Sequence, residues 1–198
     1  MIQYEYLLVI SPSGNVSVDI AKIKRIFGME YGCLFADRLT PHLTLSNFIQ
    51  SAYYEEKLIE WFKHYASSID PLKINLNGFG IFKKHTIYVN VEQQRPLREI
   101  IKGLKIRFRN QLQGFKEFPP IFGNHLHVTI ARRLNEQQAE RAWQDWQYKE
   151  FEGEFEASSM ILLKRIFNPL TGVTNNYNEV GRFRFEGKNF YGHQLGLF

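Results

Sequence analysis

Two short segments of the chain each place a histidine and a threonine two residues apart. They are His42-Leu43-Thr44-Leu45 and His127-Val128-Thr129-Ile130. In a β-strand, side chains at positions i and i+2 project from the same face, so each segment would set an imidazole beside a hydroxyl. The apolar residues of each segment would project from the opposite face, into a core. Each segment therefore predicts a strand with one polar face that could do chemistry.

Two imidazoles and two hydroxyls together suit chemistry at a phosphodiester. A neutral imidazole accepts the proton of an attacking hydroxyl or water, and a protonated one delivers a proton to the leaving oxygen. Hydroxyls beside them donate hydrogen bonds to the non-bridging phosphate oxygens. We predict that His42 and His127 are the catalytic acid and base, in an order that the sequence leaves open. Thr44 and Thr129 are predicted to bind the phosphate.

A structural interpretation competes at each of these positions. A lone histidine on a half-buried strand is more often structural than catalytic, and threonine favours strands whatever its role. The presence of two such segments, at equivalent points of two similar halves, favours catalysis. Three further histidines lack this spacing and are expected to be structural: His64, His85 and His193.

Residues beside the second segment are candidates for accessory roles. His125 shares the face of His127 if the strand begins early, where it could help to bind substrate. Arg133, six residues after His127, is placed by strict alternation to contact an anion from that face. Arg132 would then point to the opposite face. For His125 the competing interpretation is a solvent-facing loop residue, and for the two arginines a solvated strand end is the favoured interpretation.

The motifs do not favour a metal or a cofactor. Neither segment contains a carboxylate or a cysteine, and threonine is a poor metal ligand. Two-metal phosphodiesterases need several aspartates, which these segments lack. Gly78-Phe79-Gly80 is not followed by the rest of a phosphate-binding glycine loop. We therefore expect a site that works with no metal and no cofactor.

The composition is that of an ordinary globular chain with a mild positive charge. The net charge of +5 favours an anionic ligand. No apolar run approaches the roughly 18 residues of a membrane span, and the first residues do not resemble a signal peptide. The one cysteine, Cys33, cannot form an internal disulfide. We expect a cytoplasmic monomer that does not associate with membranes.

Hydrophobic periodicity predicts two halves with a similar order of elements. Strands are expected over 4–10, 42–48, 72–82, 85–91, 126–132, 155–167 and 178–186. Helices are expected over 18–27, 54–67, 96–113 and 136–149, the last with Asn135 as its N-cap. A hairpin turn is expected at Lys83-Lys84, and a loop over 115–124. The first half is thus β-α-β-α-β-β and the second α-β-α-β-β, which suggests a duplicated body with two lobes.

The chain resembles the 2H phosphoesterase superfamily, which contains the 2′-5′ RNA ligases and cyclic phosphodiesterases. The residues that carry the resemblance are Pro41-His42-Leu43-Thr44-Leu45 and His125-Leu126-His127-Val128-Thr129-Ile130-Ala131-Arg132. They match the two H-x-[ST]-x motifs of that superfamily. The resemblance implies an α+β fold with two similar lobes, each an antiparallel sheet with outer helices, and an active-site groove between them. It implies one bilobal domain over residues 1–198.

The same resemblance implies a metal-independent phosphodiesterase that acts on 2′,3′-cyclic phosphates or 2′-5′-linked phosphodiesters. The substrate would be RNA or a small cyclic nucleotide, and the sequence leaves its size open. Water as nucleophile would open a cyclic phosphate, whereas an RNA 5′-hydroxyl would make the reaction a reversible 2′-5′ ligation. Two alternatives remain: a non-catalytic RNA-binding module on the same fold, and an enzyme whose histidines act on a sugar or another metabolite.

Overall fold

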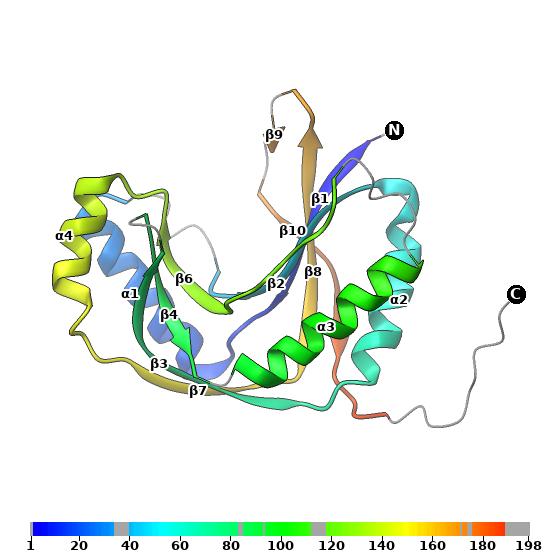
Figure 1. Cartoon of the computed structure of the whole chain (residues 1–198), viewed down its shortest axis with the longest axis horizontal. Coiled ribbons are helices and arrows are strands. Elements are labelled where there is room, and N and C mark those ends of the chain that lie inside the picture. The colour runs from blue at the N-terminus through cyan, green and yellow to red at the C-terminus, as the bar shows by residue number, and fades with distance from the viewer. Residues whose placement is uncertain are drawn as a thin grey trace, which may run out of the picture.

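The computed structural model describes residues 2–33, 40–82, 85–92, 94–111, 118–170, 172–173 and 176–188. Its strands are β1 (Gln3–Ile10), β2 (Leu43–Ser51), β3 (Leu72–Phe82), β4 (Thr86–Val91), β5 (Ile121–Phe122), β6 (His127–Arg132), β7 (Glu152–Ala157), β8 (Ser159–Asn168), β9 (Gly172–Val173) and β10 (Asn178–Arg184). Its helices are α1 (Gly14–Tyr31), α2 (Glu55–Ser67), α3 (Gln94–Gln111) and α4 (Glu136–Trp146), with a 3₁₀ turn η1 (Ala52–Tyr54). The predicted α+β fold is confirmed, and Figure 1 shows the helices outside a long, bent sheet. The turn expected at Lys83-Lys84 and the histidine at position 193 lie outside the described residues.

The described strands join one antiparallel sheet. Its order is β10-β8-β1-β2-β6-β4-β3-β7, with β5 paired to β2 and β9 paired to β8. Within each half the ladders are long, such as that of β1 with β2. Between the halves, within the described part of the chain, β2 and β6 share a single pair in register, Leu43 with Val128. The sheet is therefore two halves that meet at one residue pair and diverge on either side of it (Figure 1).

The two halves of the sheet are not the two halves of the chain. One sheet half combines β1 and β2 with β8 and β10, which come from far along the chain. The other combines β3 and β4 with β6 and β7. The helices cross over in the same way, because α1 packs against β6 and β7, whereas α2 packs against β10. Each lobe therefore needs segments from both ends of the chain.

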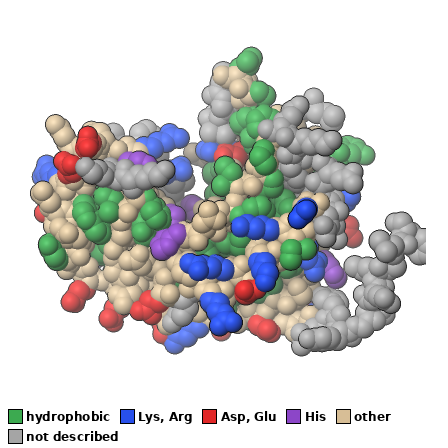
Figure 2. All heavy atoms as spheres, viewed as in Figure 1, with side chains coloured by type: hydrophobic (Ala, Val, Ile, Leu, Met, Phe, Trp, Pro, Cys, Tyr) green, Lys and Arg blue, Asp and Glu red, His purple; other side chains and the backbone are tan. Residues whose placement is uncertain are grey.

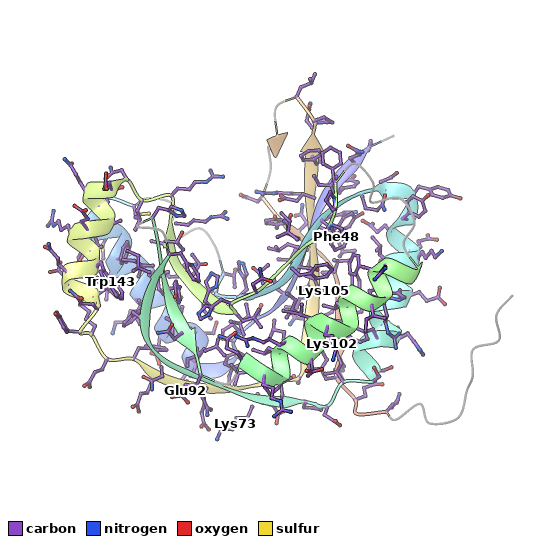
Figure 3. All side chains as sticks on the ribbon, in the orientation of Figure 1. Phe48, Lys73, Glu92, Lys102, Lys105 and Trp143 are labelled. Carbon is purple, nitrogen blue, oxygen red and sulfur yellow. The ribbon has the colours of Figure 1, made fainter. Side chains whose placement is uncertain are left out.

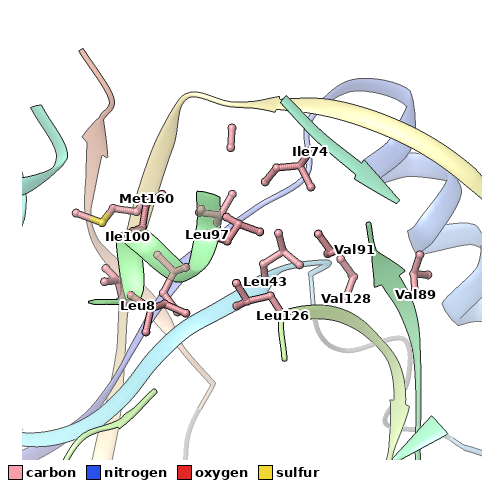
Figure 4. Close-up of a cluster of buried hydrophobic side chains, with 14 of the residues drawn as sticks. Leu8, Leu43, Ile74, Val89, Val91, Leu97, Ile100, Leu126, Val128 and Met160 are labelled. Carbon is pink, nitrogen blue, oxygen red and sulfur yellow. The ribbon is translucent and has the colours of Figure 1, made fainter. Parts of the chain in front are cut away.

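A continuous apolar core lies between the sheet and its helices. Leu43 and Val128 are fully buried in this core, with Leu8 from β1 and Leu97 from α3 nearby (Figure 4). Burial of such a side chain stabilises the fold by about 1.5–3 kcal/mol. One cluster of buried residues extends under both sheet halves, so the single pair between the halves rests on shared packing. No described helix combines the length and apolar composition needed to cross a bilayer.

Two strand predictions are corrected by the structure. The strand expected over 155–167 is two strands, because the chain changes partners at Ser158: β7 pairs with β3, and β8 pairs with β1. The loop expected over 115–124 contains β5, whose two residues are too few to show an alternating pattern. A change of ladder partner leaves no mark on hydrophobic periodicity, which explains the first error.

Helix boundaries differ by up to four residues, as at both ends of α1 (Gly14–Tyr31, predicted over 18–27). Helix α1 begins at Gly14 rather than Val18, since its first turn is solvent-exposed or half-buried and shows little apolar periodicity. Helix α4 ends at Trp146, three residues before the predicted end. The predicted N-cap is confirmed: Asn135 Oδ1 accepts a hydrogen bond of 2.8 Å from the backbone N–H of Gln138.

Candidate active site

The two histidine–threonine segments meet where the two halves of the sheet join. The paired residues Leu43 and Val128 are the central positions of the two motifs. Continuing this antiparallel register by one residue places His42 across from Thr129 and Thr44 across from His127. On this register the two histidines lie on a diagonal of the junction, on the same face of the sheet. The structure thus brings all four predicted site residues together.

The faces of these two strands are fixed by burial. Leu43 and Val128 are 0% exposed, whereas the histidines and threonines on either side are half-buried. Figure 2 shows the molecule hollowed between its two halves, with histidine side chains gathered in the hollow. The sheet therefore turns its apolar residues to the core and its four candidate residues to a groove.

Each histidine ring is held by a matching hydrogen bond. His42 Nδ1 lies 2.8 Å from the carbonyl oxygen of Thr40, and His127 Nδ1 lies 2.8 Å from the carbonyl oxygen of His125. Because a carbonyl oxygen only accepts, Nδ1 carries the proton in both rings. Nε2 is then the nitrogen left to accept or deliver a proton, as general acid–base catalysis requires.

Burial lowers the pKa of both imidazoles below the ordinary histidine value. For His42, the positive charges of Lys24, Arg132 and His127 lower the pKa further, and the hydrogen bond to Thr40 opposes these effects. For His127, the neighbouring His125 lowers the pKa further, and its hydrogen bond to the His125 carbonyl opposes this. The influence of His127 on His42 agrees with their proximity across the junction.

Aromatic rings form a wall beside His127. Its ring centroid lies 4.8 Å from that of Phe82 and 4.9 Å from that of Tyr88, and these two aromatic rings stack at 4.1 Å. The exposed His125 ring lies 5.5 Å from Phe82. A Cβ at Gly80 would lie 2.5 Å from the Tyr88 ring, so a larger residue at this position would displace the ring. The predicted accessory residue His125 is thus part of the wall.

Each motif strand has a bulge directly after its threonine. The ladder of β1 with β2 passes over Leu45, and the ladder of β4 with β6 passes over Ile130. A bulge adds one residue to a strand and so reverses the alternation beyond it. Arg132 therefore returns to the face of His127, and the expectation that it points away is wrong. Arg133 follows the strand with φ 60° and is exposed, so alternation does not place it, and its contact with an anion stays a prediction.

The electrostatic neighbours of Arg132 place it near the other wall of the groove. Burial lowers the pKa of its guanidinium, and the positive charges of Arg133 and Arg165 lower it further, while Tyr177 and Glu5 raise it. Glu5 and Arg165 belong to β1 and β8, in the opposite half of the sheet, and Tyr177 directly precedes β10 of that half. Two arginines, one from each half, therefore face the same space, which favours an anion there.

Arg165 is fixed by a network around Glu5. Glu5 accepts hydrogen bonds of 2.9 Å from Asn47 Nδ2 and from the Tyr177 hydroxyl, and it also pairs with Arg165. Burial raises the pKa of Glu5, but the hydrogen bonds from Arg165, Asn47 and Tyr177, with the charge of Arg165, hold it below its usual value. The carboxylate is therefore ionised and keeps the arginine in place.

A cavity of about 580 Å³ opens beside His42. Its lining is apolar on β1 and β8 and polar at the margin: Leu7, Val9, Ser11, Pro12, Thr40, His42, Ile161, Leu163, Arg165, Asn176, Tyr177, Glu179 and Arg182. An apolar surface with a few convergent polar groups is typical of small-ligand sites, which measure about 300–1,000 Å³. A larger cavity, of about 750 Å³ between α2 and β10, contains none of the motif residues.

Several residues of this groove were missed in the sequence. They are Phe82, Tyr88, Arg165 and Tyr177, and Arg132 was expected on the wrong face. The chain has 27 phenylalanines and tyrosines, 17 and 10 respectively, and composition cannot choose among them. A glycine within a strand signals a close approach, so Gly80 was the one available sign of the aromatic wall.

A sheet that joins two H-x-T strands at their central residues, with both histidines turned to one groove, defines the class of 2H phosphoesterases. Residues 12–166 match the model of the 2′-5′ RNA ligase superfamily, and the chain belongs to that superfamily. This membership supports an enzyme of phosphodiesterase type. None of the curated proteins compared with the chain matches it.

Solved structures show the same fold at low sequence identity. The crystal structure of E. coli LigT complexed with 3′-AMP has a TM-score of 0.61 and 15% identity, covering 93% of this chain and 99% of LigT. The complex of LigT with NADP+ has a TM-score of 0.60 and 13% identity, with the same coverage of 93% and 99%. TT0787 of Thermus thermophilus has a TM-score of 0.57 and 13% identity, covering 93% of this chain and 100% of its own. The fold is therefore that of LigT over nearly the whole chain.

The lowered pKa values of the two histidines predict a loss of stability in mild acid. The unfolded chain takes up protons near pH 6.5, whereas the folded chain takes them up only at lower pH. Stability is therefore complete above about pH 6.5 and falls as the pH decreases below it. Urea unfolding of the wild type and of the double variant His42→Gln/His127→Gln, at intervals from pH 8 to 5, measures this. The wild type should lose more stability than the variant below about pH 6.5, and a parallel decline of the two proteins would contradict the lowered pKa values.

Proposed function

We propose that the protein is a metal-independent phosphodiesterase acting on 2′,3′-cyclic phosphates or 2′-5′-linked phosphodiesters of RNA or small cyclic nucleotides. The observation that carries this proposal is the pairing of Leu43 with Val128. It sets two equivalent histidines on one face of the sheet, each with its Nδ1 bonded to a carbonyl. LigT has been crystallised with 3′-AMP, with NADP+ and with phosphate, which supports a nucleotide phosphate as the ligand of the groove here.

The proposed mechanism needs one neutral and one protonated imidazole. His42, beside the charges of Lys24 and Arg132, is better suited to remain neutral and to remove a proton from the nucleophile. The His127 ring lies against Phe82 and Tyr88, and aromatic faces attract a cation at such distances. We therefore assign the base to His42 and the acid to His127. A bound phosphate raises the pKa of both rings, so one of them carries a proton in the complex.

The threonines and an arginine complete the proposed site. Thr44 and Thr129 donate hydrogen bonds to the non-bridging oxygens, and Arg132 supplies positive charge to the same group. Water as nucleophile opens a 2′,3′-cyclic phosphate to a monoester, and an RNA 5′-hydroxyl joins the ends through a 2′-5′ linkage. The proposed partner is RNA or a cyclic nucleotide bound to a monomer.

No metal is required in this mechanism. Among the residues that the structure describes, no group of three or more His, Cys, Asp or Glu is placed to hold a metal ion. The positive charge that a metal would bring to the phosphate comes from Arg132 in this proposal. Independence from metal remains a prediction, which turnover in the presence of EDTA tests.

Activity on cyclic phosphates tests the proposed function directly. The purified protein, in EDTA, is assayed with 2′,3′-cyclic mononucleotides and with 2′-5′-linked dinucleotides. We expect turnover by the wild type, and a loss of about 10²–10⁴-fold in kcat/KM for His42→Gln and for His127→Gln. His64→Gln, on the exposed side of α2, is the matched control and should keep full activity. Binding of RNA without turnover would favour the non-catalytic module, and activity restored only by added metal would contradict the metal-free mechanism.

A substrate with a good leaving group separates the acid from the base. A phosphodiester that releases p-nitrophenolate needs little protonation of its leaving oxygen, so it bypasses the general acid. On this substrate, His127→Gln should recover most of the wild-type rate, and His42→Gln should remain impaired. Equal impairment of the two variants on both substrates would contradict the assignment, and recovery of His42→Gln alone would reverse it.

Substitution of the threonines distinguishes catalysis from strand structure. Valine keeps the branched shape but lacks the hydroxyl donor. A lost hydrogen bond to a charged group is worth about 1.5–3 kcal/mol, or roughly 10–150-fold in rate when it acts in the transition state. Thr44→Val and Thr129→Val should lower kcat/KM by that factor with little change in Tm, and Thr→Ser should cost less. Full activity of the valine variants would show that these threonines are only strand residues.

A further inference from the structure

The positive charge of the chain is concentrated on one helix. Helix α3, with the sequence QRPLREIIKGLKIRFRNQ, contains six arginines and lysines and one glutamate. The whole chain has 25 basic and 20 acidic side chains, so the remainder has 19 of each. The net charge of +5 is therefore the charge of α3. Figure 2 shows basic side chains spread over this helix, on the same side of the molecule as the hollow.

Four of these side chains form a stripe along α3: Arg98, Lys102, Lys105 and Arg109, which we call the α3 stripe. Their spacing of four, three and four residues places them on one side of the helix. All four are exposed, and the opposite side of α3 is buried in the core. Figure 3 shows Lys102 and Lys105 following one another along the helix. Among the described acidic residues, Glu99 pairs with the stripe at 3.7 Å from Lys102, and one carboxylate leaves the four cations strongly positive.

This arrangement does not serve the stability of the helix. Like charges three or four residues apart destabilise a helix by about 0.2–0.5 kcal/mol per pair. The first turn of α3 contains no acidic residue, and Arg95 is the second residue of the helix. The helix dipole favours negative charge at this end. A polyanion bound along α3 would relieve this repulsion, which favours a binding role for the stripe.

The first residue of α3 is attached to the candidate active site. The Gln94 side chain accepts a hydrogen bond of 3.0 Å from the backbone N–H of Leu126 and donates one of 2.8 Å to the Leu126 carbonyl. Leu126 immediately precedes His127. With a rise of 1.5 Å per residue, the stripe extends from about 6 Å to about 22 Å beyond this attachment. Because α3 packs on the apolar face of the sheet and the groove lies on the other face, a chain of phosphates that leaves the groove near His127 reaches the stripe by passing around the sheet at Leu126.

We propose that the α3 stripe binds the phosphate backbone of an RNA whose reactive phosphate occupies the groove, so that the substrate is a polynucleotide rather than a free cyclic nucleotide. The identity of the occupant as RNA rests on the proposed function, because the groove is suited to a phosphate beside a ribose hydroxyl. The stripe supplies affinity without sequence preference, since it offers charges to the backbone and no groups aimed at bases.

The test replaces the four stripe residues by glutamine and compares two substrates. One is a 2′,3′-cyclic mononucleotide, and the other is a hairpin RNA with a single-stranded 3′ end that carries a 2′,3′-cyclic phosphate. We expect KM for the RNA to rise roughly tenfold or more, with kcat and all mononucleotide constants unchanged. The matched control replaces four exposed basic residues of α1 and α2 and should leave both substrates unaffected: Lys22, Arg25, Lys57 and Lys63.

Direct binding separates this proposal from the proposed function. The probe is the same hairpin ending in a 3′-phosphate, titrated at several salt concentrations. The stripe variant should bind more weakly, and the slope of log K against log salt should fall by about 3, since each lost phosphate contact removes about 0.7–0.9. This result supports the stripe even if no turnover is found. Unchanged RNA binding by the stripe variant, or an equal loss in the control variant, would overturn the proposal. Vesicles of anionic lipid are titrated in parallel. If the stripe variant loses binding to the vesicles but not to the RNA, the proposal is also overturned.

Discussion

The pair formed by Leu43 and Val128 determines the arrangement of the groove. It joins two long ladders at one point, and the strands diverge on either side, so the sheet bends there and leaves a hollow. Both side chains are fully buried in a core that continues under the two halves. A slip of one residue in either strand would turn its histidine and threonine into that core and expose the leucine or valine. The core therefore enforces the register that sets the two motifs against each other.

The part of the site that follows from a period of two could be predicted from the sequence. His42 and Thr44, and likewise His127 and Thr129, share a face because a strand alternates, and the structure keeps that relation. Arg132 could not be predicted, because the bulge at Ile130 depends on how the neighbouring β4 pairs with β6. The interlocked lobes were equally hidden, since partner choice between strands is decided by contacts far apart in the chain.

The walls of the groove come from long-range contacts as well. The Glu5 network joins β1 to Tyr177, 172 residues away, and no local pattern announces such a pair. The aromatic wall comes from β3 and β4, which are ordinary strand patterns in sequence, and only Gly80 shows that a ring needs space above it. Local chemistry thus identified the reacting groups, and tertiary pairing supplied the groups that hold and surround them.

The surroundings of the two histidines act in two opposing ways on the proposed chemistry. Lys24 and Arg132 lower the pKa of His42, which favours a neutral base, whereas burial and the neighbouring His125 lower the pKa of His127, which disfavours the protonated imidazole that the acid must be. An anionic phosphate between the histidines compensates those charges and favours protonation of the ring that it contacts. In this view the substrate completes the acid: its negative charge raises the pKa of the ring that it contacts, so that this ring takes up a proton from solvent and delivers it to the leaving group. We propose that the aromatic wall, which contacts His127, favours this ring as the one that receives the proton.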